Sequence, residues 1–164
     1  MCAFINIQKT PNKKRIFFLI LMALLLISGA MLFNGPNQSQ TIVVGFPSGS
    51  NLQTDVAQTP EMLFIGLAFQ NYLPDNQGLL FIFESSATHK VRTKGYRFPV
   101  DVMWVDESKH IVHLVKNALP CQEDPCPWYG PPPNNARYII EANQGFIKNN
   151  GVSMGDQLTF TLRL

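Results

Sequence analysis

The sequence predicts an α+β fold: a compact, mostly antiparallel β-sheet or barrel-like domain with two short helices, preceded by one N-terminal transmembrane or signal helix. Three observations support this. An uncharged apolar run lies near the N-terminus, about seven short β-rich segments follow it, and strands mostly follow strands without intervening helices. Of the 164 residues, 15% are charged and 46% hydrophobic, so the chain can form a packed core.

The apolar run at residues 16–33 contains eighteen residues and no charge. A helix of this length is close to the lower limit of about 17 residues for crossing a bilayer. The basic residues 13–15 precede it and predict that residues 1–15 stay cytoplasmic. The run is either a retained transmembrane signal anchor or a signal peptide cleaved near the small residues 28–30. We therefore expect a single-pass protein of the inner or cytoplasmic membrane with its C-terminal domain outside the cytoplasm or, after cleavage, a secreted or periplasmic protein.

The net charge of +2 is unevenly distributed along the chain. Residues 1–15 carry four Lys or Arg and no acidic residue, whereas the remainder has nine Lys or Arg against eleven Asp or Glu. The basic character thus belongs to the N-terminus, and no basic stripe follows it, so nucleic acid is not an expected partner. The expected partners are the membrane, through the N-terminal helix, and an envelope ligand or protein.

Residues 34–40 are polar and rich in turn formers, which predicts a linker to an extracytoplasmic domain at residues 41–164. The first expected strands are 41–44 and 52–57. Thr59 as N-cap and Pro60 as the first helical residue predict a helix start. Because the following apolar residues, 62–69, leave no polar face, we expect this helix to be buried or to lie against the membrane.

Residues 79–83 form a continuous apolar strand, and the chain then reaches its densest signal at residues 94–106. There Val100, Val102 and Trp104 alternate with Asp101, Met103 and Val105 on the opposite face of a strand. A buried Asp101 needs a partner, since an unpaired buried carboxylate costs several kcal/mol. Lys94 and Arg97 are close enough in sequence to supply the charge, and both are candidate binding residues.

The remaining elements follow in order. Residues 111–116 return antiparallel, residues 137–142 form another strand, residues 144–150 form a short helix ended by Gly151, and residues 157–164 alternate as a final strand.

The segment 117–135 holds six prolines and two cysteines, Cys121 and Cys126. In an oxidising compartment these two cysteines most simply form a disulfide. A zinc site would need two more ligands, and His110 and His113 point to opposite faces of a strand; thiol redox chemistry is the other alternative. Trp128 and Tyr129, in the same segment, either contact a ligand or fold back on the core.

Over residues 59–164 the chain resembles the family of domain of unknown function 192 (DUF 192, also called UPF 0127). The matching motifs are Gly66-Leu67, Leu73-Pro74-Asp75, Gly78-Leu79-Leu80-Phe81-Ile82-Phe83, Lys94 to Asp106, Val112-His113, Asn117, the Cys121 and Cys126 loop with Tyr129, Ala136 to Ala142, Gly145, Gly151-Val152 and Gly155-Asp156. The resemblance implies a compact, β-rich single domain, often exported or membrane-anchored, and implies no established activity.

The chain departs from the family pattern in two places. An aromatic-Trp-Met run usually precedes the position of Lys94, whereas this chain has Val91-Arg92-Thr93. The family often has Arg where this chain has Leu63 and Gln70. If those family residues line a site, that site is altered here.

Three functions remain open, and the sequence indicates no cofactor. The favoured one is a non-catalytic binding or accessory module of the cell envelope, because no nucleophile–base pattern is present. The second is a small envelope hydrolase or transferase that uses Asp101 and Glu141 as paired carboxylates. The structural alternative is that Glu141 pairs with Arg137 or a backbone group. The third is a metal or redox module that acts through Cys121 and Cys126.

Overall fold

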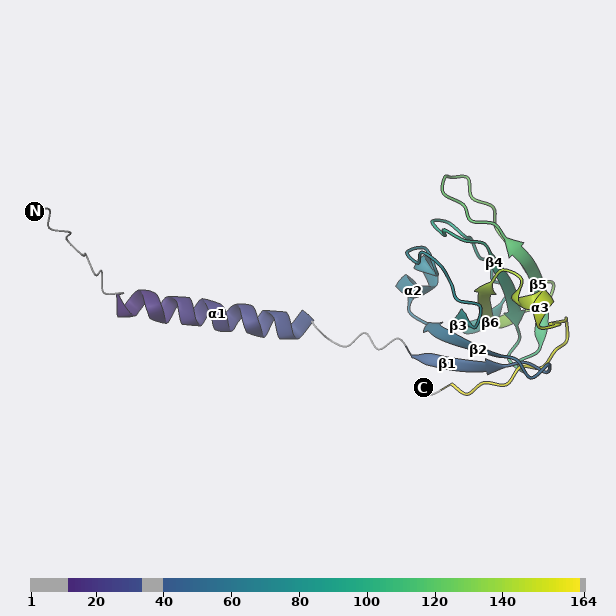
Figure 1. Cartoon of the computed structure of the whole chain (residues 1–164), viewed down its shortest axis with the longest axis horizontal. Helices are drawn as coiled ribbons and strands as arrows, with labels where there is room; N and C mark the ends of the chain where they lie inside the picture. Colours follow the sequence, from purple (N-terminus) through teal and green to yellow (C-terminus); the bar gives the residue numbers. More distant parts are fainter. Residues whose placement is uncertain (1–11, 34–39, 163–164) are drawn as a thin grey trace, which may run out of the picture. The chain divides into compact units, whose positions relative to one another are not determined.

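The computed structural model of this protein describes residues 12–33 and 40–162 and separates the chain into two units, residues 1–38 and 39–164. The first unit contains helix α1, Lys13–Phe33 (Figure 1). Within the described ranges, no helix meets the length and apolarity needed to cross a membrane. The transmembrane or signal helix and the localisation stay predictions. The predicted linker, apart from Gln40, lies outside the described residues.

The second unit is built on one six-stranded sheet (Figure 1). Its strands are β1 (Thr41–Gly45), β2 (Asn51–Ala57), β3 (Gln77–Ala87), β4 (Val100–Val105), β5 (Ile111–Ala118) and β6 (Ala136–Asn143). Their order is β1-β2-β3-β6-β4-β5, and every neighbouring pair is antiparallel except the parallel pair β2–β3. The prediction of a mostly antiparallel sheet with few short helices is confirmed.

The barrel-like alternative is wrong for the named strands, which form an open sheet with β1 and β5 at its edges. The predicted final strand at 157–164 is also wrong over its described part, because those residues form only isolated bridges. Thr159 pairs with Gly45 at the end of β1, and Gln157 pairs with His110 just before β5. The C-terminal segment thus connects the two edges of the sheet without adding a regular strand.

Both faces of the sheet are covered, and each carries its own hydrophobic core. Met103 and Ile140 belong to one cluster, which also contains Phe146 and Ile147 from α3 (Phe146–Asn149). Trp104 belongs to the second cluster, on the opposite face. All six residues of β4 are buried. The alternation predicted for residues 100–105 therefore separates two interiors, as expected for a central strand.

Helix α2 (Pro60–Ile65) begins as predicted, because the Thr59 hydroxyl accepts a hydrogen bond of 3.3 Å from the Met62 amide. It ends earlier than predicted, at Gly66, whose φ of 52° stops the helix. None of its residues is buried, and Phe64 is 82% exposed. The expectation of a buried helix is wrong, because the chain turns at Gly66 and only then inserts Leu67 into the core.

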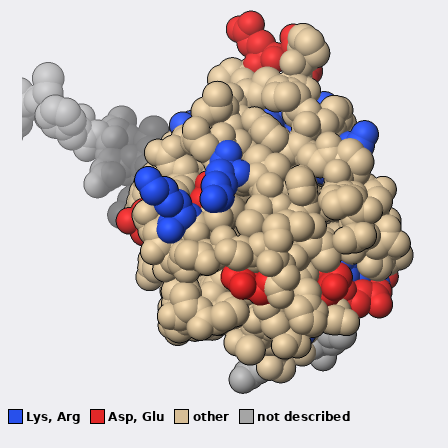
Figure 2. Space-filling view, turned by 90° about the vertical axis from the view of Figure 1, so that its right-hand side faces the viewer, with Lys and Arg blue, Asp and Glu red and all other residues tan. Residues whose placement is uncertain are grey.

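The charged side chains of the sheet unit are scattered. On the face shown in Figure 2, small groups of charged side chains, some with Lys or Arg beside Asp or Glu, lie among uncharged residues, and no continuous basic surface is visible among the described residues.

Candidate ligand-binding site

Two carboxylates, Asp101 on β4 and Glu141 on β6, are buried in the sheet, with relative exposures of 1% and 0%. The strands pair antiparallel with Asp101 opposite Ala142 and Val102 opposite Glu141. Because successive side chains in a strand alternate between faces, Asp101 and Glu141 point to opposite sides of the sheet. The structure therefore does not bring the two predicted catalytic carboxylates together.

Each carboxylate oxygen of Asp101 has a backbone donor. One carboxylate oxygen accepts from the Asn117 amide at 2.8 Å and the other from the Ile147 amide at 2.9 Å. It thereby ties β4 to the end of β5 and to α3. The expected partners are wrong: Lys94 pairs with Asp124, and Arg97 hydrogen-bonds the Asn71 side chain.

Glu141 is only half satisfied. Its Oε2 accepts a hydrogen bond of 2.8 Å from the Tyr96 hydroxyl, while its buried Oε1 has no hydrogen-bond partner among the described residues. Burial raises the pKa of Glu141 to about 8, against a small opposing effect of the Tyr96 hydrogen bond. The carboxyl is therefore mostly protonated at pH 7, and Oε1 can donate a hydrogen bond. The expected partner Arg137 contacts the Glu84 carbonyl instead.

Tyr96 lies against the chain that leaves α2. Its hydroxyl donates to Glu141, and the backbone of Leu67 acts on the same hydroxyl in the direction that lowers its pKa. Burial, followed by the nearby Glu141, raises the pKa of Tyr96 above its usual value. Gly66 makes this arrangement possible, because a Cβ at that position would lie 2.2 Å from the Tyr96 hydroxyl oxygen.

Glu141 and Tyr96 line a pocket of about 150 Å³. Its walls are mainly apolar and largely aromatic, formed by Leu63, Phe64, Phe81, Phe83, Val91 and Trp128. A cavity of about 150 Å³ lined by apolar side chains can hold a molecule the size of benzene. The pocket thus has room for one ring, with a buried polar group in its lining.

Two cations, Lys90 and Arg92, also line the pocket. Val91 pairs antiparallel with Tyr129, which places Arg92 directly across from Trp128. The Arg92 guanidinium carbon lies 4.3 Å from the centre of the Trp128 ring, a cation–π contact. Within the described chain, neither cation forms an ion pair with a carboxylate.

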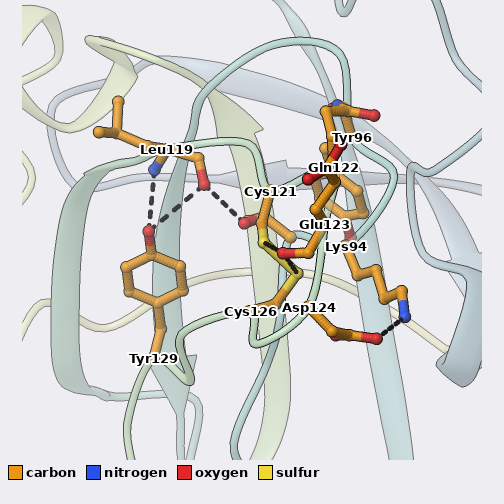
Figure 3. The surroundings of a disulfide bond; sticks show 10 residues. Lys94, Tyr96, Leu119, Cys121, Gln122, Glu123, Asp124, Cys126 and Tyr129 are labelled. Atoms are coloured by element: carbon orange, nitrogen blue, oxygen red, sulfur yellow. Dashed lines mark hydrogen bonds and ion pairs between the residues drawn. A yellow bond between two sulfur atoms is a disulfide. The ribbon is translucent and has the colours of Figure 1, made fainter.

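The proline-rich loop is pinned by the predicted disulfide between Cys121 and Cys126, which is confirmed (Figure 3). The Cys121 amide donates to the Thr93 carbonyl at 3.1 Å, and the Gln122 side chain donates to the Tyr96 carbonyl. The loop therefore holds the turn that carries Tyr96, and further along it also supplies Trp128.

The other predicted binding residues have structural contacts. Tyr129 accepts a hydrogen bond of 3.0 Å from the Leu119 amide, and Lys94 is paired with Asp124 on the disulfide loop (Figure 3). Of Lys94, Arg97, Trp128 and Tyr129, only Trp128 lines the pocket.

The metal alternative gains no support from the geometry. Cys121 and Cys126 are bonded to each other, and no group of three or more His, Cys, Asp or Glu side chains among the described residues could hold a metal ion.

Sequence reasoning did not select Tyr96, Lys90 or Arg92 as site residues. The sequence does contain a pointer to this pocket, because Gly66 and Tyr96 both lie in the motifs that carry the family resemblance. Three positions where the chain departs from the family pattern, Leu63, Val91 and Arg92, also line the pocket.

These features define a small β-sheet domain that is pinned by a disulfide and has an aromatic-walled pocket on one face. The chain belongs to the DUF192 family, described as "Uncharacterized ACR", which matches residues 43–160. The resemblance predicted from the sequence is thus confirmed, and the match extends upstream to β1 and β2. No curated protein matches the chain.

Two solved structures share the fold. One is a "putative transcription regulator" from Sinorhizobium meliloti, 24% identical, with a TM-score of 0.64 over 73% of this chain and 92% of that one. The other is a protein of unknown function from Novosphingobium aromaticivorans, 21% identical, with a TM-score of 0.64 over 76% of this chain and 89% of that one. At these identities the likeness concerns the fold alone.

Proposed function

We propose that this domain is a non-catalytic binding module whose site is the pocket at Glu141. The observation that carries the proposal is the Glu141 Oε1, which is fully buried, lacks a hydrogen-bond partner among the described residues and belongs to a pocket-lining side chain. A buried polar atom without a partner costs about 1–3 kcal/mol. A ligand that hydrogen-bonds to this atom would recover that free energy.

The walls support the same proposal. Small-molecule sites are concave and mostly apolar, with a few placed polar groups that orient the ligand. Phe81 is 3% exposed and forms part of the packed core, whereas Trp128 is 55% exposed, so the pocket joins the interior to the surface. The positions at which this chain departs from its family would then adjust which ligand is accepted.

The test is an amide chemical-shift titration of the full chain with a set of single-ring probes: phenol, benzoate and 4-hydroxybenzoate. We expect saturable shifts at the amides of Gly66, Tyr96 and Glu141. Leu63→Trp should block the shifts by filling the pocket, whereas Met154→Trp, at an exposed position outside the pocket lining, should leave them unchanged. The absence of saturable shifts for all three probes would refute the pocket as a binding site.

An acid-catalyst role for Glu141 is the second candidate, because a carboxyl with a raised pKa in a pocket is typical of a general acid. Non-catalytic binding is favoured, since the other buried carboxylate, Asp101, lies on the opposite face of the sheet. The test is to measure hydrolysis of an ester or glycoside of the ring probes. Hydrolysis by the native chain that is lost in Glu141→Gln would show that Glu141 is catalytic.

Placement outside the cytoplasm is part of the proposal. The basic residues before the apolar run and the disulfide between Cys121 and Cys126 support it, because disulfides persist mainly in oxidising compartments. A C-terminal alkaline phosphatase fusion should be active, and an inactive fusion with a normally expressed protein would contradict export.

A further inference from the structure

We infer that the ligand of this pocket is a small flat ring with an anionic group at one end and a hydrogen-bonding group at the other. This inference rests on the proposed function and specifies the class of ligand. The charges and the depth of the pocket-lining side chains carry it.

The pocket has an inner and an outer end. Glu141 and Tyr96, with exposures of 0% and 2%, lie at the inner end. Phe64 and Trp128, with exposures of 82% and 55%, lie at the outer end. A ligand that fills the pocket therefore presents one end to a buried carboxyl and the other to the surface.

The inner end selects a neutral polar group. Tyr96 already donates to one oxygen of Glu141, so the other oxygen, which is buried and has no partner among the described residues, is the one left for a ligand atom that reaches the inner end. A hydroxyl suits this position, because it can both accept from a protonated carboxyl and donate to an ionised one. A charged group would have to lose its hydration shell in an apolar interior, which is much more costly.

The outer end selects an anion. Lys90 is exposed and Arg92 half-buried, and neither forms an ion pair in the described part of the chain. Arg92 acts electrostatically on Asp124, which is paired with Lys94, but forms no ion pair with it. Both cations can therefore contact a carboxylate at the pocket entrance, with Arg92 held in place by its stacking on Trp128. Arg favours such sites because its planar guanidinium matches a carboxylate.

The space between the two ends selects a ring. Phe81 and Phe83 line the pocket from β3, and His89 stacks on Phe83 with 3.7 Å between ring centroids. Phe83 is thereby fixed as a flat wall on one side. Trp128 provides an aromatic surface at the outer end, and a pocket of about 150 Å³ suits one ring.

The experiment compares three probes that share one ring and one hydroxyl: 4-hydroxybenzoate, neutral 4-hydroxybenzyl alcohol and cationic 4-hydroxybenzylamine. Binding to the full chain is measured at low ionic strength by amide shifts of Gly66, Tyr96 and Glu141. We expect 4-hydroxybenzoate to bind about tenfold tighter than the alcohol and the amine to bind weakest. This preference should shrink as salt is added.

The variants locate the charge effect. Lys90→Gln combined with Arg92→Gln should remove the preference for the anion, so that 4-hydroxybenzoate binds no tighter than the alcohol. Lys148→Gln, the same type of charge removal at an exposed position of α3, should preserve the preference. Thermal unfolding of each variant verifies that it is folded.

The outcomes separate the two proposals. If the alcohol or the amine binds as tightly as the anion, with shifts at the same pocket amides, the binding site stands and the anionic ligand class is wrong. If the anionic preference survives in the double variant, the assignment to Lys90 and Arg92 is wrong. If no probe shifts these amides, the proposed function itself fails.

Discussion

Asp101 and Glu141 are buried to the same extent and lie on neighbouring strands, yet they differ in how many of their carboxyl oxygens accept a hydrogen bond. Asp101 receives two backbone amides and joins β4 to β5 and α3. Glu141 receives one phenol hydroxyl and keeps one oxygen without a partner among the described residues. Burial alone therefore does not distinguish a structural carboxylate from a candidate binding group, whereas the number of its donors does.

The difference follows from what each face of the sheet packs against. On the Asp101 side, α3 brings a free backbone amide directly to the carboxylate. On the Glu141 side, the neighbouring segments contribute aromatic rings and a glycine, which leave a pocket instead of a second donor. Substitutions on one face of the sheet at a time separate the two roles, and the largest expected change in stability comes first.

The largest expected effect is a pH-dependent loss of stability caused by Glu141. Its folded-state pKa of about 8 lies above the ordinary value of 4.5, so the folded chain binds this proton more tightly than the unfolded chain. The contribution to stability is complete below pH 4.5, falls as the pH rises towards 8 and is lost above that. At about 1.4 kcal/mol per pH unit, the upper limit is about 5 kcal/mol, which water entering the pocket would reduce.

Urea unfolding at pH 5.5, 7.0 and 8.5 measures this effect against Glu141→Gln. The variant keeps an acceptor for the Tyr96 hydroxyl and has no titrating group at position 141. Its free energy of unfolding should therefore rise relative to that of the native chain as the pH increases. Glu84→Gln, at an exposed position, should follow the native chain. Parallel curves for the native chain and Glu141→Gln would mean that Glu141 titrates normally.

The second largest effect is expected for Asp101→Ala. The substitution leaves two backbone amides without their charged acceptor, and each such hydrogen bond contributes about 1.5–3 kcal/mol. We expect a loss of about 4 kcal/mol in the free energy of unfolding, measured by urea denaturation. Asp55→Ala, on the exposed side of β2, should lose less than about 1 kcal/mol. A loss at Asp101 no larger than at Asp55 would contradict its structural role.

Much of the fold was predictable because its signals are local. The alternation of residues 100–105 places them correctly on two faces, and the spacing of Cys121 and Cys126, together with the expectation of export, predicts their disulfide. The helix start at Thr59 and Pro60 also follows from local capping chemistry.

The candidate site was less predictable because five separate segments form it. The Tyr96–Glu141 hydrogen bond spans 45 residues, and it depends on the pairing of β4 with β6, which short sequence patterns do not reveal. Nearby charges in the sequence suggested Lys94 and Arg97 as partners of Asp101, whereas backbone amides from distant elements supply the donors. Sequence proximity is a poor guide to the partner of a buried carboxylate when backbone donors can reach it.

The third effect concerns the close contact that positions Tyr96 beside Glu141. In Gly66→Ala the new Cβ would lie 2.2 Å from the Tyr96 hydroxyl, in addition to the backbone strain of a positive φ. We expect a loss of about 3 kcal/mol in stability, against about 1 kcal/mol for Gly151→Ala. Gly151 has a similar φ of 63° and no neighbour within 4 Å, so it is the control for a positive φ without a steric clash, whereas the ψ of −125° at Gly66 adds backbone strain of its own. Equal losses would show that Tyr96 can move without cost.

The smallest effect is expected on removing the disulfide, and it should be confined to the Glu141 side of the sheet. A bond that closes such a short loop contributes about 2 kcal/mol, so Cys121→Ser with Cys126→Ser should lose about that much. Hydrogen exchange should accelerate at the Cys121 and Tyr96 amides, because the loop holds the Tyr96 turn. It should not change at Ile147, whose amide is bound by Asp101. Cys2→Ala serves as the control for loss of a thiol. Faster exchange at both the Tyr96 and the Ile147 amides would contradict the prediction and show that the two faces of the sheet open together.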